Sequence, residues 1–488
     1  MKKKFLAIIS ATLLATNAFA LSIKKTELVM RDHRNLAASH TTFNQLKRDD
    51  STKERLATKL QKTAFYKQTH EESELGEVFG AHGRNWISIG LATSAAEGTV
   101  DVENNLILHH QANANVLAGK IFFEPRQVAH GVRVDTVLYL DNFFKGLYFK
   151  NNIICKYVKN NLRVHIEDEQ VGAITNENLR LKEILNGTTL TRISLSDQQD
   201  ALLFAKLTGP LSRTGLENLE SCIGIRLMKK GRFTGGLNFA WITPTGDRRT
   251  TGEFLWEPKL GSEHWGLGGG IEAKVKLWSD EDQSLRLSLE GNYRYLLKET
   301  EKRTLGLKGL LTTDYYNEHI LSHYYLLGRL NHRGLFPAAN VLTQEVDVTP
   351  GSKIDAIACF NYKHNNLCID FGYNLFWKDS ESVSLKHPWQ NNVIGLASPT
   401  YDANEVKDPL FKAANLRSGT SWISSSNIDT HVAETPSILS HTIFGGIGYL
   451  LEVFDLPFMV GTGAAYEIGD GRSASDAFSL WLKTGVSF

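Results

Sequence analysis

The 488-residue chain has little of several features that mark common protein classes. Only four Cys are present, which fits an exported bacterial protein that does not depend on disulfides. The formal net charge of +1 gives no reason to expect nucleic acid or an acidic partner. After Ala20 no apolar run reaches about 18 residues, which excludes a membrane-spanning helix. If the mature chain enters a membrane, the remaining option is a closed barrel in which every backbone polar group is paired.

The first 20 residues have the three parts of a secretory signal peptide. Three consecutive Lys at 2–4 precede an apolar stretch at 5–15, and Ala18-Phe19-Ala20 supplies small residues for cleavage. The apolar stretch is too short to span a bilayer. The residue directly after Ala20 is not Cys, so a lipid-anchored protein is not expected. We therefore predict a signal peptide over 1–20 and export of the remaining chain.

Long stretches after residue 85 alternate between apolar and polar side chains, as strands with one apolar face do. In 285–297 every second residue is apolar or Gly, and Arg286, Glu290 and Arg294 occupy positions between them. Residues 265–277, 367–377 and 478–488 repeat the pattern. A soluble strand usually has about 5–6 residues, whereas one that crosses a membrane needs about 9–11. The alternation favours membrane-spanning strands, although ordinary β-propensity is an alternative.

The spacing of these segments predicts an antiparallel barrel of about 14 strands, and it is compatible with any number from 12 to 16. The strands are expected near 115–124, 129–141, 144–166, 215–228, 232–243, 264–278, 284–298, 303–311, 319–330, 352–363, 366–378, 440–452, 457–468 and 476–488. Residues 86–93 could form a further strand. Short gaps alternate with long ones, as expected for periplasmic turns and outer loops. The long outer loops are expected near 167–214, 244–263, 331–351 and 379–439.

Residues 21–84 differ from the rest of the chain because they lack clear strand alternation. Seven charged residues crowd positions 47–55, and 41–63 could be helical. Two interpretations are open: a polar, partly disordered periplasmic extension, or a small hatch inside the barrel. The barrel itself is expected over 85–488.

Charged side chains at alternating strand positions are expected to face the lumen. On the lipid side each Arg or Lys would cost about 2–4 kcal/mol at mid-depth. The predicted lumen-lining residues are Glu272, Lys274, Lys276, Arg286, Glu290, Arg294, Asp355 and Asp370. They could shape a solute path, or only stabilise the wall through opposite charges on neighbouring strands. Their mixed sign argues against a sharply ion-selective pore.

No sequence pattern indicates catalysis, a metal site or a cofactor. The chain has no GxSxG or HExxH motif, and neither Cys pair has metal-ligand spacing. Cys359 and Cys368 flank a tight turn, and a cross-strand disulfide between them requires a specific register. We predict that the protein is not an enzyme.

The signal peptide, the alternating strands and the ending Trp-Leu-Lys-Thr-Gly-Val-Ser-Phe together resemble Gram-negative outer-membrane β-barrel proteins over 85–488. Among these, the porin-like transporters and the long-chain fatty-acid transporters are most similar in strand number and N-terminal segment. The resemblance implies an all-β fold in the cell outer membrane, with outer-membrane lipid and the barrel-assembly machinery as partners. It implies an assembly signal at Phe488, Val486 and Leu482. The ending departs from the usual pattern at Lys483 and Val486.

These observations predict a channel or transporter for passive or hatch-gated passage of a small solute, without covalent chemistry. A surface-exposed binding or adhesion barrel acting through 167–214 and 379–439 is the alternative, and a barrel hydrolase is a third. Self-association into a homo-oligomer and the identity of the solute stay open.

Overall fold

A computed structural model describes most of the chain, and all structural statements below refer to the described residues. These are 25–28, 30–31, 57–70, 75–81, 83–90, 100–108, 118–170, 172–174, 177–187, 199–207, 209–230, 232–246, 251–311, 321–402, 410–469 and 475–488. The predicted signal peptide lies outside them. No helix among them is long and apolar enough to cross a bilayer.

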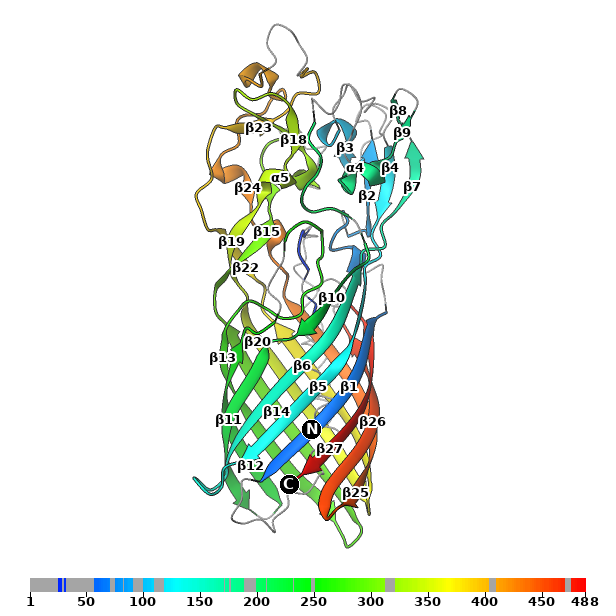
Figure 1. The fold of residues 1–488 in the computed structure, drawn as a ribbon, viewed down its shortest axis with the longest axis vertical. Helices are drawn as coiled ribbons and strands as arrows, with labels where there is room; N and C mark the ends of the chain where they lie inside the picture. The colour runs from blue at the N-terminus through cyan, green and yellow to red at the C-terminus, as the bar shows by residue number, and fades with distance from the viewer. Residues whose placement is uncertain are drawn as a thin grey trace, which may run out of the picture.

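Twelve of the described strands pair in an antiparallel sheet that closes on itself (Figure 1). They are β1 (Thr58–Thr69), β5 (Arg126–Tyr139), β6 (Leu147–Asn161), β11 (Leu219–Lys230), β12 (Phe233–Thr243), β13 (Gly266–Ser279), β14 (Gln283–Leu296), β20 (Gly351–His364), β21 (Leu367–Lys378), β25 (Ile438–Val453), β26 (Leu456–Ile468) and β27 (Ala477–Ser487). A thirteenth strand, β10 (Leu211–Leu216), pairs with the outer part of β6, while β11 pairs with its opposite part. The twelve barrel strands have 11 to 16 residues each, which suffices to cross a bilayer.

The barrel is closed by the first and last of these strands. β1 pairs with β27 on one side and with β5 on the other, and β5 continues into β6. The last residue takes part, because Phe488 and Thr58 exchange two backbone hydrogen bonds of 2.6 and 2.9 Å. Among the described strands, no edge of this sheet therefore presents unpaired backbone groups along its length, which is the condition for a sheet in lipid.

The outer face of the barrel is apolar and exposed. Ile271, Phe371 and Leu482 are 63%, 60% and 59% exposed, although they are large hydrophobic residues. Tyr293, Tyr295, Tyr373, Tyr449 and Tyr466 lie on the same face. Water would oppose such a surface, whereas lipid stabilises it. The expected assembly-signal residues Leu482 and Phe488 are on this face, with Val486 half-buried between them.

The two ends of the barrel differ. At one end, consecutive strands are joined by short turns at 140–146, 231–232, 280–282, 365–366 and 454–455, and the chain ends there. At the other end the connections 70–125, 162–218, 244–265, 297–350 and 379–437 are much longer, whereas 469–476 is short. Short turns are periplasmic and long loops external in outer-membrane barrels, so the long connections face outward.

The long connections fold into a cap above the barrel (Figure 1). It contains small sheets and short helices. One sheet consists of β2 (Trp86–Gly90), β3 (Val102–Glu103), β4 (Ala118–Phe122) and β7 (His165–Gln170). Two three-stranded sheets consist of β15 (Glu299–Thr304), β19 (Thr343–Thr349) and β22 (Ser382–Leu385), and of β17 (Leu326–Arg329), β18 (Leu335–Pro337) and β23 (Ile394–Leu396). Two strand pairs consist of β16 (Gly306–Leu307) with β24 (Ile428–Asp429), and of β8 (Gly172–Ile174) with β9 (Glu177–Leu179). The helices are α4 (Leu181–Leu185), α5 (Ala339–Leu342), η3 (Asn104–Leu106), η6 (Ser322–Tyr324), η7 (Ala413–Asn415), η8 (Ser425–Asn427) and η9 (His431–Ala433). Ile87, Leu181, Leu307 and Leu396 meet in one hydrophobic core, so different loops stabilise each other.

The strand number lies at the lower limit of the predicted range, for identifiable reasons. The expected strands near 303–311 and 319–330 belong to the cap, and the 331–351 loop is part of a connection that spans 297–350. β15 has charges on both faces, through Glu301 and Arg303 on one and Lys302 on the other, so neither face suits lipid. The segments near 115–124 and 86–93 contain cap strands β4 and β2.

The barrel also begins earlier than the predicted boundary at residue 85. β1, at Thr58–Thr69, is a barrel strand, whereas the sequence placed it in a polar and partly helical extension. Its outward positions include Lys62 and Gln68 as well as Leu60 and Tyr66, and this mixture hides the alternation.

The lipid-facing assignment predicts an effect of charge that depends on position. An Ile271→Arg variant should lose about 2–4 kcal/mol of unfolding free energy, because Ile271 lies near mid-depth on the outer face. Leu203→Arg is the matched control, since Leu203 is 54% exposed on the cap. Both variants are unfolded with denaturant in lipid vesicles. The folded fraction at each denaturant concentration is read from the difference in gel mobility between folded and boiled protein. Equal stability of the two variants would contradict the assignment.

Candidate functional site in the barrel lumen

The strand register places lumen-facing side chains of like charge opposite one another on neighbouring strands. Glu272 lies directly opposite Glu290, and Lys276 lies directly opposite Arg286. Arg294 lies opposite Lys353, which is opposite Lys378 in turn. Like charges in directly opposed positions destabilise a sheet. The lumen wall therefore carries an arrangement that sheet stability alone does not favour, so these charges are candidates for a functional role.

Most of the sequence-predicted lumen residues surround one cavity of about 400 Å³. Those that line it are Glu272, Lys274, Arg286, Glu290, Arg294 and Asp355. It extends from Arg294 and Lys353, near the outer ends of β14 and β20, to Lys59 and Tyr139, at the periplasmic ends of β1 and β5. The cavity thus follows the wall over most of the strand length.

Ion pairs across strands hold several of these groups. Lys150 Nζ lies 3.1 Å from Glu272 Oε2, and a guanidinium nitrogen of Arg294 lies 2.6 Å from Glu220 Oε1. Sequence analysis had not identified Lys150 or Glu220 as lumen residues. Both are separated in sequence from their partners by more than 70 residues, so only the folded sheet brings them together.

The remaining two predicted residues lie elsewhere. Lys276 is exposed near the periplasmic end of β13, on the same face as Lys274. Asp370 is buried in the wall, where Asn361 Nδ2 donates to its Oδ1 at 2.6 Å. Ser288 in turn donates to Asn361 Oδ1 at 2.7 Å. Asp370 therefore belongs to a wall network rather than to the cavity lining.

The other side of the lumen is packed with side chains. Phe444, Trp481 and Ile357 form a buried cluster. Gly372 and Gly463 make room for it: a Cβ on Gly372 would lie 2.4 Å from the Phe444 ring, and one on Gly463 would lie 2.5 Å from Trp481. The cavity lies away from this cluster, along β1, β5, β6, β11, β12, β13, β14 and β20.

The two cysteines that flank the turn between β20 and β21 are free thiols. Cys359 lies opposite Gly372, and Cys368 lies opposite Lys363, so they are not a directly opposed pair. Among the described residues, no group of three or more His, Cys, Asp or Glu side chains is placed to hold a metal ion.

A short N-terminal stretch enters the lumen at the outer end. Arg31 donates hydrogen bonds to Asn374 of β21 and to Ser440 and Thr442 of β25. Its guanidinium also lies 3.3 Å from Glu467 Oε1 and 3.7 Å from Asp355 Oδ1. The sequence left open whether residues 21–84 are a periplasmic extension or a hatch inside the barrel. Arg31, which belongs to this segment, lies inside the barrel.

The residues just before Arg31 are fixed to the cap. Thr26 N and Lys25 N donate to the carbonyl oxygens of Val432 and Val78, and Thr26 Oγ1 donates to Thr304 O. Leu28, Met30 and Arg31 line a second cavity of about 80 Å³, which shares Ile242, Lys353 and Phe376 with the larger one. Residues 25–28 and 30–31, called the latch below, therefore lie at the outer mouth of the cavity.

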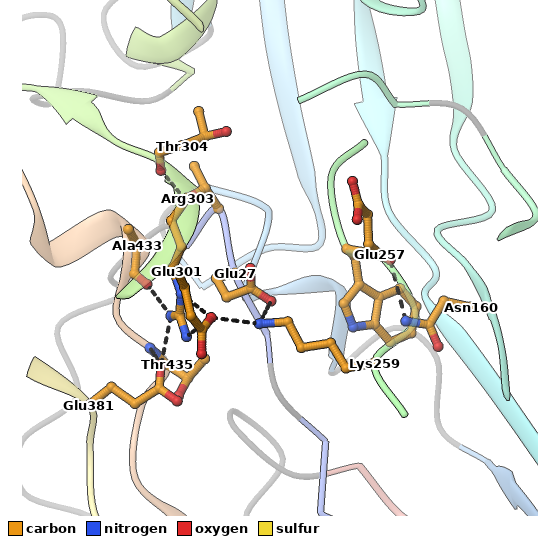
Figure 2. A network of polar contacts seen from close by, with 12 residues as sticks. Glu27, Asn160, Glu257, Lys259, Glu301, Arg303, Thr304, Glu381, Ala433 and Thr435 are labelled. Atoms are coloured by element: carbon orange, nitrogen blue, oxygen red, sulfur yellow. Dashed lines mark hydrogen bonds and ion pairs between the residues drawn. The ribbon is translucent and has the colours of Figure 1, made fainter. Parts of the chain in front are cut away.

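A buried network of charges holds the latch to three of the long connections (Figure 2). Lys259 Nζ lies 3.4 Å from Glu27 Oε1 and 3.2 Å from Glu301 Oε2. Arg303 joins Glu301 at 2.9 Å and Glu381 at 2.7 Å, and it also donates to Ala433 O. Residues of the latch and of the connections after β12, β14 and β21 thus converge on one site.

The network keeps Glu301 and Glu381 charged. Burial alone would raise the pKa of Glu301, but Arg303 and Lys259 outweigh it and hold that pKa well below its usual range. Burial likewise opposes ionisation of Glu381, and Arg303 with Lys378 lowers its pKa. Each charge is compensated only while its partners are present, which makes the site sensitive to loss of any one of them.

Comparisons with known proteins show similarity only to solved structures. No family model and no curated protein matches the chain. An outer-membrane channel from Pseudomonas putida F1 is 8% identical, with 89% of this chain and 96% of that chain covered at a TM-score of 0.38. A FadL homologue of Pseudomonas aeruginosa is also 8% identical, with 88% and 90% covered and a TM-score of 0.27. The translocator domain of the autotransporter NalP from Neisseria meningitidis gives 8% identity, 93% and 92% coverage, and a TM-score of 0.28.

The class of protein follows from the geometry of the chain itself. A closed antiparallel sheet with an apolar exposed outer face, a polar lumen, short turns at one end and long loops at the other defines an outer-membrane β-barrel protein.

Loss of one network carboxylate should release the cap from the latch. A Glu301→Gln variant leaves Arg303 and Lys259 with less compensation in a buried site, so it should destabilise the cap by about 3–5 kcal/mol. Glu345→Gln is the control, because the Glu345 pair with Lys386 is at the surface and should contribute nothing measurable. Hydrogen exchange of cap amides measures the change. Equal protection in the two variants would show that the network does not hold the cap.

Proposed function

We propose that the protein is an outer-membrane channel for small solutes, closed at its outer mouth by the latch. The observation that carries the proposal is the wall cavity, which runs from the mouth to the periplasmic ends of the strands and is lined by charged and polar residues. Cavities lined in this way are typical of solute paths, because a charged solute can exchange water for wall groups along them.

The closed state depends on Arg31. Its guanidinium lies 4.6 Å from the Phe376 ring centre and contacts side chains of β20, β21, β25 and β26. Phe376 also lines both cavities, so Arg31 is held where they meet. Passage requires the latch to move, and the buried charge network around Glu301 and Arg303 sets the energy of that movement.

This proposal predicts that loss of the Arg31 side chain opens the channel. An Arg31→Ser variant should increase the open fraction in planar bilayers about tenfold or more, since each 1.4 kcal/mol of lost latch stability is a factor of ten. Arg329→Ser, an exposed Arg on the cap, should conduct like the unmodified chain. Absence of conductance from both variants, with a correctly folded barrel shown by heat-shifted gel mobility, would contradict the proposal.

A surface-binding function is a second candidate, favoured by the cap. Its core draws on connections from most parts of the barrel, which is more structure than loops need merely to join strands. If this function is correct, cells that carry a variant lacking residues 386–430 should no longer attach to a host or neighbouring surface. The barrel of that variant should still fold, as shown by a heat-dependent change in its gel mobility. Unchanged attachment would count against this function.

A further inference from the structure

We infer that the lumen cavity selects small anions, with a carboxylate or phosphate group as the recognised feature. This inference rests on the proposed channel and specifies its substrate class. It comes from the sign and the pairing of the charges around the cavity, which the alternating sequence pattern does not reveal.

Cations outnumber carboxylates among the described residues that line the cavity. The eight cationic residues are Lys59, Arg133, Lys150, Arg226, Lys274, Arg286, Arg294 and Lys353. The five carboxylates are Asp135, Glu220, Glu272, Glu290 and Asp355. The lining therefore has an excess of three positive charges, and low-dielectric walls focus such a field on the space between them.

The carboxylates are also engaged. Asp135 lies 2.6 Å from Arg133, and Glu220 and Glu272 pair with Arg294 and Lys150. Glu290 accepts a hydrogen bond of 2.9 Å from Asn292, and Asp355 lies close to Arg31 and accepts from Asn374. An entering cation would have to compete with these partners at each of the five carboxylates.

Unlike these carboxylates, two arginines of the cavity lining have no partner of opposite charge among the described residues. Arg226 and Arg286 line the cavity and are half-buried, and neither forms an ion pair with another described residue. Arg286 lies directly opposite Lys276, so its nearest charged neighbour across the ladder is another cation. Cations kept together in this way favour an anion between them.

Arg226 is oriented by aromatic rings rather than by a carboxylate. Its guanidinium carbon lies 4.6 Å from the Tyr139 ring centre and 5.7 Å from that of Tyr148. Stacking uses the flat face of the guanidinium and leaves its N–H edges for an acceptor. A planar carboxylate or a phosphate fits two of these donors at once. Arg226 and Arg286, four and three residues from the periplasmic ends of β11 and β14, thus place two such cationic groups on the cavity lining near the inner opening.

A binding measurement tests the site without requiring conductance. Citrate is titrated into the full-length protein in detergent at low salt, with glucose as the neutral comparison. Arg226→Gln combined with Arg286→Gln should weaken citrate binding about tenfold or more, since each Arg supplies charge-assisted hydrogen bonds. Arg329→Gln combined with Lys386→Gln removes two cap cations and should leave binding unchanged. No citrate binding by the unmodified chain, or equal binding by both double variants, would overturn the inference.

Ion selectivity separates this inference from the proposed function. In the Arg31→Ser background, a KCl gradient across a planar bilayer should show chloride preferred over potassium, and the Arg226 and Arg286 substitutions should reduce that preference. Preference for potassium would overturn anion selection while leaving the channel intact. Citrate binding without any conductance would support the anion site and contradict the channel.

Discussion

Every backbone polar group in a membrane sheet must be paired, and the rest of this structure depends on that requirement. It is met by β1, which joins β27 to β5 and so connects the two ends of the sheet. Once the sheet is closed, alternate side chains must face either lipid or the lumen. The apolar outer face and the charged inner face then follow from a single register, and Lys150 meets Glu272 although they are far apart in sequence.

The lumen uses its two sides differently. On one side, Phe444 and Trp481 pack over glycines of the adjoining strands, which fills the space and braces the wall. On the other side, charges that oppose each other across strands surround a cavity. The latch lies where this cavity reaches the mouth, and the network around Glu301 and Arg303 joins it to the cap. A few buried charges thus connect the cap, the latch and the mouth of the cavity.

Sequence patterns predicted the parts in which lipid imposes alternation. β13, β14, β21 and β27 were found because their outward positions are almost uniformly apolar, and the short turns between strands followed from them. The pattern failed where alternation has another cause: Leu305 and Leu307 alternate because they enter the cap core, not lipid. It also failed in β1, whose outer face includes Lys62.

The candidate site was predictable only in part. Strand parity identified Glu272, Lys274, Arg286, Glu290, Arg294 and Asp355, because charges avoid lipid. It could not show which strands meet across the lumen, so Lys150, Glu220 and Arg226 were missed. Arg31 had no signal at all, since its contacts are with residues more than 300 positions away in sequence.

The position of the latch is the central claim, and cross-linking in intact outer membranes tests it most directly. Arg31→Cys combined with Thr442→Cys is treated with a short bifunctional thiol reagent, alongside Arg31→Cys combined with Glu452→Cys. Glu452 lies ten residues further along β25, about 33 Å toward the periplasm at the rise of a strand. The account predicts a cross-link for the first pair and none for the second. No cross-link between positions 31 and 442, with both thiols shown to be reactive, would contradict it.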